Sequence, residues 1–266
     1  CIRDRITDIT GVPTQTWELL NHPDRDSYDL SSLRTLGGGG GPRPAEHVKA
    51  LDKNFKGRPG IGYGLTETNA LGTMGAGEEY INNPSSAGRV VPPLTEIKII
   101  DENWQELPEG KIGEVAIRSQ SNMKGYWRND DATAECINSE GWFKSGDLGK
   151  FDGPFLYILD RLKDMVIRGG ENIACPEVEG AIYEHPDVLE ASVFGIPDER
   201  LGEILCSSIC LREGSKLSAE SLNEFLSDKL AAFKIPVKIK FTYNPLPKIA
   251  SGKFDKPTMR QNFIEE

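Results

Sequence analysis

The feature that most constrains the fold is a run of five glycines, residues 37–41, set between an apolar segment and a helix-periodic one. Residues 33–36 have the length and apolarity of a buried strand, and residues 42–55 carry apolar side chains at helical spacing. Residues 59–63 predict a second strand, which the polar loop GLTETN follows. Strand, glycine loop, helix, strand and polar loop alternate as in an α/β layer, whose loops carry function.

The pattern changes from about residue 85 onward. The segments TEIKIID and GEVAIRS alternate in polarity and are separated by turn residues, which predicts a hairpin-rich, β-barrel-like subdomain. A charged break, DRLKD, then precedes the order helix, strand, strand, helix, strand, typical of a small α+β domain. We therefore expect a larger domain over residues 1–160, with an α/β layer over 1–80 and a β-rich subdomain over 81–160, and a small mobile C-terminal domain over 161–266.

Composition excludes several classes of function. A net charge of −10 argues against nucleic-acid binding, which requires a basic face. Apolar runs are too short for a transmembrane segment, and peripheral membrane contact stays open without an amphipathic basic helix to indicate it. Five irregularly spaced cysteines favour a reducing, cytoplasmic compartment. The chain starts abruptly, without Met or a signal peptide, which predicts a truncated chain or a fragment.

Common catalytic motifs are missing. The sequence has no GxxxxGK[ST] phosphate loop, HExxH, GxSxG or paired CxxC, and Pro42 and Arg43 prevent the glycine run from forming a dinucleotide-binding GxGxxG. Kinases, dehydrogenases, zinc proteases and serine hydrolases therefore lose their usual support.

Five other segments occur in a fixed order: GGGGGPRP (37–44), YGLTET (63–68), GWFKSGDLG (141–149), DRLKDMVIRGGENIACPEVE (160–179) and PLPKIASGK (245–253). In order and spacing they resemble the later core motifs of the AMP-forming acyl-CoA synthetases, a family that also includes firefly luciferases and peptide-synthetase adenylation domains. The resemblance covers nearly the whole chain. The family's earlier Ser/Thr/Gly-rich loop ending in Pro-Lys-Gly, which holds the ATP phosphates, does not occur here, so we expect the N-terminal part of the large domain to be missing.

The resemblance implies a nucleotide site in the larger domain. Glycine lets backbone approach a flat ligand, and the family's glycine segment, here Gly39, Gly40, Gly41 and Pro42, lies along the adenine. Tyr63, followed by Gly64, offers an aromatic face to the same ring.

Phosphate, metal and ribose contacts are implied by the same motifs. Thr66 corresponds to the α-phosphate contact, and Glu67 to the Mg²⁺ ligand, since carboxylate oxygens suit this hard ion. Asp147 can accept hydrogen bonds from two ribose hydroxyls, and Arg161 is the expected second ribose contact.

The small domain contributes the remaining implied roles. Lys163 stands at the family's hinge, where many members carry Asp. Gly169, Gly170 and Glu171 belong to the segment that lines the coenzyme A channel. Lys253 is the expected catalytic lysine, which stabilises charge during adenylation from a loop that should be mobile.

The implied activity is ATP-dependent adenylation of a carboxylic acid, followed by thioester formation with coenzyme A and release of AMP and pyrophosphate. The segments NMKGYW and GVPTQTWELL most resemble bacterial medium- and long-chain fatty-acyl-CoA ligases, and the small residues Ala70, Gly72 and Gly75 are expected to leave room for an acyl chain. Three alternatives remain: an adenylation domain that loads a carrier protein, a luciferase-like oxidase, and a truncated, non-catalytic nucleotide-binding fragment.

Overall fold

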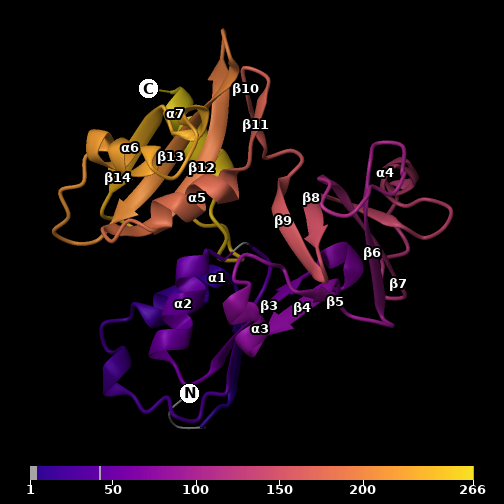
Figure 1. Ribbon diagram of the computed structural model, residues 1–266, viewed down its shortest axis with the longest axis horizontal. Helices are drawn as coiled ribbons and strands as arrows, with labels where there is room; N and C mark the ends of the chain where they lie inside the picture. The colour runs from indigo at the N-terminus through magenta and orange to yellow at the C-terminus, as the bar shows by residue number, and fades with distance from the viewer. Residues whose placement is uncertain (1–4, 42, 266) are drawn as a thin grey trace. The chain divides into compact units, whose positions relative to one another are not determined.

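The computed structural model describes residues 5–41 and 43–265 of the chain (Figure 1). The chain divides into two compact units, Cys1–Leu162 and Lys163–Glu266. Among the described residues, none of the helices combines the length and the apolarity that crossing a bilayer requires.

The first unit begins with an α/β layer. Its three strands are parallel neighbours and alternate with two helices: β1 (Asp8–Gly11), α1 (Pro13–Leu20), β2 (Thr35–Gly38), α2 (Ala45–Asn54) and β3 (Arg58–Tyr63). A single-turn 3-10 helix, η1 (Arg25–Ser27), lies between α1 and β2. Leu20, Leu36 and Leu51 meet in the core between the helices and these strands. Pro13 starts α1 at a position where its missing N–H costs no hydrogen bond.

Antiparallel strands continue the same sheet. They and their connecting helices are η2 (Thr66–Thr68), β4 (Thr73–Ala76), α3 (Gly77–Asn82), β5 (Arg89–Val90), β6 (Thr95–Ile100), β7 (Gly113–Ser119), α4 (Asp130–Cys136), β8 (Phe143–Asp152) and β9 (Phe155–Arg161). The order is β1-β2-β3-β4-β5-β9-β8-β7-β6, so β4 and β5 join the α/β layer to the β-rich part through continuous hydrogen bonding. Ile99, Val115, Ile117 and Leu156 are buried together in the β-rich part.

The second unit is a sheet covered by helices on both faces. Its elements are β10 (Val166–Arg168), β11 (Glu171–Ile173), α5 (Cys175–Tyr183), β12 (Val188–Asp198), β13 (Gly202–Leu211), α6 (Ala219–Ser227), η3 (Ala232–Lys234), β14 (Lys238–Thr242) and α7 (Lys256–Ile264). Side chains alternate along β12: Val193 packs in the core with α5 and α6, whereas Phe194 packs in the core with α7. The fold class, an α/β and β-rich part followed by a small α+β domain, is confirmed.

Most predicted elements form near their expected positions. The Ser218 hydroxyl accepts a hydrogen bond from the Ser221 N–H at 3.2 Å and so caps α6, as predicted. The predicted glycine loop over residues 37–41 is wrong at its start, because β2 extends into its first two residues. Several elements have no counterpart in the prediction, among them β4, α3, α4, the β10–β11 hairpin and α7. They are short, whereas sequence patterns predict long, strongly periodic elements best.

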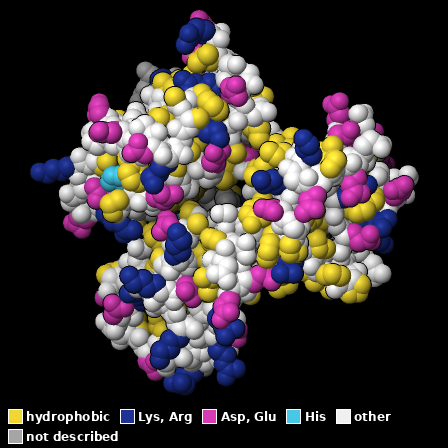
Figure 2. All heavy atoms as spheres, viewed as in Figure 1, with side chains coloured by type: hydrophobic (Ala, Val, Ile, Leu, Met, Phe, Trp, Pro, Cys, Tyr) yellow, Lys and Arg dark blue, Asp and Glu magenta, His cyan; other side chains and the backbone are white. Residues whose placement is uncertain are grey.

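Charged side chains of both signs are interspersed over the face shown in Figure 2, where no broad basic area appears. The sequence as a whole carries a net charge of −10.

Candidate functional site

Three predicted site residues of the first unit are in direct contact. Tyr63, at the end of β3, donates a hydrogen bond from its hydroxyl to Asp147 Oδ2 at 2.8 Å. Arg161 Nε lies 3.2 Å from Asp147 Oδ1. Asp147 and Arg161 stand opposite each other on β8 and β9, so the sheet register creates this pair. We call Tyr63, Asp147 and Arg161 the carboxylate cluster.

Burial controls the electrostatics of this cluster. Asp147 is only 4% exposed, and its two oxygens have a phenol and a guanidinium as partners. Burial, and secondly the nearby Asp147 charge, raises the pKa of Tyr63 well above its usual range, so the phenol stays protonated and donates. Each carboxylate oxygen accepts through two lone pairs. The Arg161 side chain beside this carboxylate is 47% exposed.

The first glycines of the run are required by the packing of the protein itself. Gly39 pairs with Gly62 in an isolated bridge, and a Cβ added at Gly39 would lie 2.7 Å from the Gly62 carbonyl oxygen. A Cβ at Gly38 would lie 2.0 Å from Nη2 of the buried Arg43, whose Nη1 donates to the Gly60 carbonyl at 3.0 Å. Close approach of backbone to backbone thus explains Gly39, whereas Gly38 makes room for the buried Arg43 side chain.

The later glycines differ from the first ones. Gly40 has φ +77°, a backbone conformation that favours glycine. A Cβ added at Gly41 would meet no atom within 4 Å, so this position borders open space. Pro42, predicted to lie with them along an adenine, falls outside the described residues.

The turn after β3 carries Thr66 and Glu67. Thr66 is exposed, whereas Glu67 is half-buried and accepts a hydrogen bond on Oε1 from the Tyr126 hydroxyl at 2.9 Å. The chain folds back tightly here, since a Cβ at Gly64 would lie 2.4 Å from the carbonyl carbon of Ala70. Asn69 and Ala70 have φ of +52° and +61°, a left-handed conformation that costs free energy for residues other than glycine.

One carboxylate, rather than a cluster, is available for a cation. Among the described residues, no group of three or more His, Cys, Asp and Glu side chains is arranged to hold a metal ion. A Mg²⁺ ion at Glu67 would need most of its ligands from phosphate oxygens and water, which is how this ion usually binds beside nucleotides. The single carboxylate fits that mode of binding.

Small residues after η2 have a packing role. A Cβ at Gly72 would lie 2.6 Å from the Tyr63 carbonyl oxygen, and a Cβ at Gly75 would lie 3.1 Å from the Gly88 Cα. These glycines let β4 and the residue before it approach their neighbours.

The remaining predicted residues belong to the second unit. Lys163 is its first residue and is exposed. Gly169 and Gly170 form the turn between β10 and β11, with φ of +59° and +88°, and Glu171 begins β11. All three are exposed, so the turn is not covered by the rest of its own unit.

Lys253 is exposed on a loop whose two ends are anchored. Its carbonyl accepts from the Ile249 N–H at 2.9 Å. Before it, Lys248 pairs with Glu190 at 2.8 Å, and after it, Lys256 pairs with Glu179 at 2.9 Å. The two glutamate side chains are 8% and 11% exposed, so both anchors are largely removed from solvent. The two ends of the loop are therefore anchored, and the mobility of the residues between them stays a prediction.

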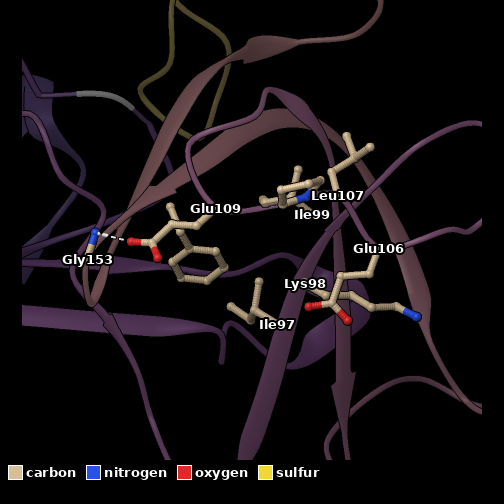
Figure 3. Close-up of a pocket in the computed structure, with 9 residues that line it drawn as sticks. Ile97, Lys98, Ile99, Glu106, Leu107, Glu109 and Gly153 are labelled. Atoms are coloured by element: carbon tan, nitrogen blue, oxygen red, sulfur yellow. Dashed lines mark hydrogen bonds between the residues drawn. The ribbon is translucent and has the colours of Figure 1, made fainter.

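A hollow on the β-rich part is separate from the predicted residues. Ile97, Ile99, Leu107 and Phe151 contribute its apolar lining, and its volume is about 250 Å³. Figure 3 shows the Glu109 carboxylate turned toward Gly153, whose N–H donates to Glu109 Oε1 at 2.9 Å. No predicted site residue lines this hollow, so the carboxylate cluster and the η2 turn, rather than this hollow, form the candidate site.

Two contacts at the site were not anticipated from the sequence. Tyr126 lies in NMKGYW, a segment noted only for its resemblance to fatty-acyl-CoA ligases, and it bonds to Glu67. The Ser145 hydroxyl accepts from the Asp147 N–H at 3.1 Å. Ser145 lies two residues before Asp147 in SGDLG, where a short-range Ser–Asp turn could have been predicted. No comparable local signal connects Tyr126 to Glu67.

Two family models match parts of the chain. The model of the AMP-binding enzyme family matches residues 1–127, and that of the AMP-binding enzyme C-terminal domain matches residues 177–253. YngI of Bacillus subtilis (strain 168) is 40% identical over 99% of this chain and 48% of its own length. A feruloyl-CoA synthase of an Amycolatopsis species is 37% identical over 98% of this chain and 52% of its own length. The bovine mitochondrial medium-chain acyl-CoA ligase ACSF2 is 37% identical over 97% of this chain and 42% of its own length.

Solved structures give the same picture. The amide bond synthetase McbA from Marinactinospora thermotolerans superposes with a TM-score of 0.89 at 32% identity, covering 98% of this chain and 53% of that one. The anthranilate CoA ligase AuaEII, in complex with anthranoyl-AMP, superposes with a TM-score of 0.89 at 28% identity, covering 98% of this chain and 50% of that one. The chain spans about half the length of the curated relatives it matches.

Proposed function

The chain belongs to the family of AMP-binding, adenylate-forming enzymes, and from that premise we propose that it supplies most of the nucleotide site of an acyl-CoA ligase. The proposed reaction has two steps. A carboxylate oxygen attacks the α-phosphorus of ATP, which forms an acyl-AMP and releases pyrophosphate. The thiol of coenzyme A then attacks the acyl carbon, which forms the thioester and releases AMP.

The observation that carries this proposal is the carboxylate cluster. Asp147 presents a buried carboxylate that Tyr63 and Arg161 hold from both sides. Such a group, with two lone pairs on each oxygen, suits a pair of vicinal hydroxyls, as in ribose. The Tyr63 ring and the open space beside Gly41 are then proposed to border the adenine.

The η2 turn is proposed to hold the phosphate end. Exposed Thr66 offers a hydroxyl to the α-phosphate, and Glu67 offers a carboxylate oxygen to Mg²⁺. A bound Mg²⁺ would neutralise phosphate charge during the transfer. Thr66 and Glu67 are then placed beside the proposed nucleotide, because η2 begins three residues after Tyr63.

The second unit is proposed to supply groups for each step. Lys253, an exposed ammonium on an anchored loop, stabilises negative charge at the α-phosphate in the first step. Gly169, Gly170 and Glu171 form the turn proposed to line the path of coenzyme A, and Lys163 is the proposed hinge. Four described cysteines are free thiols, which fits the reducing, cytoplasmic compartment that we propose.

A fatty acid is the proposed acid. The bovine medium-chain acyl-CoA ligase supports this assignment by its name, whereas the feruloyl-CoA synthase and the anthranilate ligase act on aromatic acids by theirs. Assay of pyrophosphate release with ATP, coenzyme A and either octanoate or ferulate separates the two classes. Faster release with ferulate would contradict the fatty-acid assignment and leave the adenylation chemistry in place.

Binding of AMP to the chain tests the carboxylate cluster directly. Asp147→Asn should weaken AMP binding by roughly tenfold or more, because an amide forms weaker hydrogen bonds with hydroxyls than a charged carboxylate does. Asp152→Asn, an exposed position on the same strand, is the matched control and should bind as the unaltered chain does. Equal affinities of the two variants in isothermal titration calorimetry would refute the ribose assignment. AMP binding without pyrophosphate release would favour a non-catalytic nucleotide-binding fragment.

A further inference from the structure

The side chain of Glu67 is held by a residue from a distant segment. Tyr126 lies 59 positions after Glu67 in the sequence, and its hydroxyl donates to Glu67 Oε1 at 2.9 Å. A phenol is protonated at neutral pH, so it donates to the carboxylate.

The contact belongs to a wider attachment between two segments. The Met123 N–H donates to the Glu67 carbonyl at 2.7 Å. The Ser121 hydroxyl donates to the Thr68 carbonyl at 2.9 Å, and Asn69 Nδ2 donates to the Ser121 carbonyl at 3.2 Å. With the phenol, these hydrogen bonds join residues 121–126 to the turn that carries Glu67.

Helix α4 supports residues 121–126 from the other side. The Tyr126 N–H donates to Thr133 Oγ1 at 2.9 Å. A Cβ at Gly125 would lie 2.8 Å from Thr133 Cγ2, so the segment passes very close to the helix. Tyr126 therefore projects from a backbone that is fixed independently of its own side chain.

We propose that Tyr126 is a positioning residue, whose hydroxyl occupies one oxygen of Glu67 and leaves the other oriented as the ligand of a divalent cation. This inference rests on the proposed function, in which Glu67 binds Mg²⁺. The terminal torsion of a glutamate is broad, so an unrestrained carboxylate must be ordered when it binds an ion. A donor to the second oxygen removes part of that cost, as outer hydrogen bonds do for metal ligands in general.

A packing role alone does not account for the hydroxyl. Tyr126 is 39% exposed and the neighbouring Trp127 is 86% exposed, so this stretch lies at the surface rather than in a core. Replacement by Phe keeps the ring and removes only the donor. A purely structural residue would affect folding, whereas a positioning residue would affect the dependence of nucleotide binding on the cation.

The test uses Tyr126→Phe, Glu67→Gln and the double variant, with Tyr157→Phe on β9 as the matched control. ATP binding is measured by calorimetry over a series of Mg²⁺ concentrations, AMP binding without Mg²⁺, and the midpoint of thermal unfolding separately. Tyr126→Phe should raise the Mg²⁺ concentration at half-effect roughly tenfold, with AMP binding and the unfolding midpoint unchanged. Because Tyr126 acts through Glu67, it should add nothing in the Glu67→Gln background.

The outcomes separate this inference from the proposed function. If Glu67→Gln shifts the Mg²⁺ dependence and Tyr126→Phe does not, Tyr126 has no positioning role and the Mg²⁺ assignment stands. If Glu67→Gln has no effect, or the unaltered chain shows no Mg²⁺-dependent binding, both the assignment of Glu67 and this inference are wrong. Weaker AMP binding by Tyr126→Phe without Mg²⁺ would indicate a structural role and overturn the proposal.

Discussion

Substitution of single glycines separates those needed for packing from those available to a ligand. In Gly39→Ala, the new methyl group would lie 2.7 Å from the Gly62 carbonyl oxygen, closer than such contacts allow. The obstacle is backbone, so the two segments must move apart by a few tenths of an ångström. Overpacking of this kind costs about 1–3 kcal/mol. The unfolding midpoint of the first unit should fall by roughly 3–10 °C.

Gly41→Ala is the matched control within the same run. A Cβ at Gly41 would meet no atom within 4 Å, and Gly41 does not have a positive φ. Its unfolding free energy should stay within about 0.5 kcal/mol of the unaltered chain. If the adenine lies along this position, the methyl group should nevertheless weaken AMP binding.

Thermal unfolding followed by circular dichroism, together with calorimetric titration of AMP, measures both effects. The expected pattern is loss of stability in Gly39→Ala and loss of affinity with retained stability in Gly41→Ala. Equal midpoints for the two variants would refute the packing argument for Gly39. Unchanged AMP affinity in Gly41→Ala would remove that residue from the proposed adenine site.

Two further predictions concern buried polar groups. Lys248→Met removes the ion-pair partner of the Glu190 carboxylate, which is 8% exposed, and should lower the unfolding free energy by about 3–5 kcal/mol in urea denaturation. Lys49→Met breaks an exposed ion pair and should lower the unfolding free energy by less than about 1 kcal/mol. Equal losses in the two variants would contradict the argument from burial. Burial raises the pKa of Tyr63 and of Tyr183 above the ordinary value of 10.0, so the folded state holds both protons more tightly than the unfolded state. That stabilisation is complete below pH 10 and is lost as the pH rises above it. In Tyr183→Phe, the unfolding free energy should therefore decline less steeply with pH above pH 10. An unchanged slope would show that Tyr183 does not contribute.

Local chain preferences explain what could be predicted of the fold. Pro13 and Ser218 mark helix starts by backbone geometry and side-chain capping, which depend on a few neighbouring residues. The alternation in TEIKIID and GEVAIRS predicted β6 and β7, because side chains on a strand face opposite sides. Helix α7 also starts with local signals, since Asp255 caps it and Pro257 stands in its first turn, yet the prediction missed it.

The site shows the same division. The motifs placed Tyr63, Asp147 and Arg161 in one predicted site by resemblance, and the structure brings these three into contact. The roles assigned to individual glycines could not be judged from the sequence. Whether a missing Cβ makes room for a ligand or for the Gly62 carbonyl depends on which strand lies alongside.

By itself, the sequence determined many of the strands and helices, the absence of several catalytic motifs and the set of motif residues, because these depend on residue types and short spacings. Only the tertiary structure decided that Tyr126 meets Glu67, that Tyr63 meets a carboxylate 84 positions away, and that buried glutamates anchor the loop of Lys253. The physical reason is that such contacts arise from strand register and packing between distant segments. No local preference of the chain encodes them.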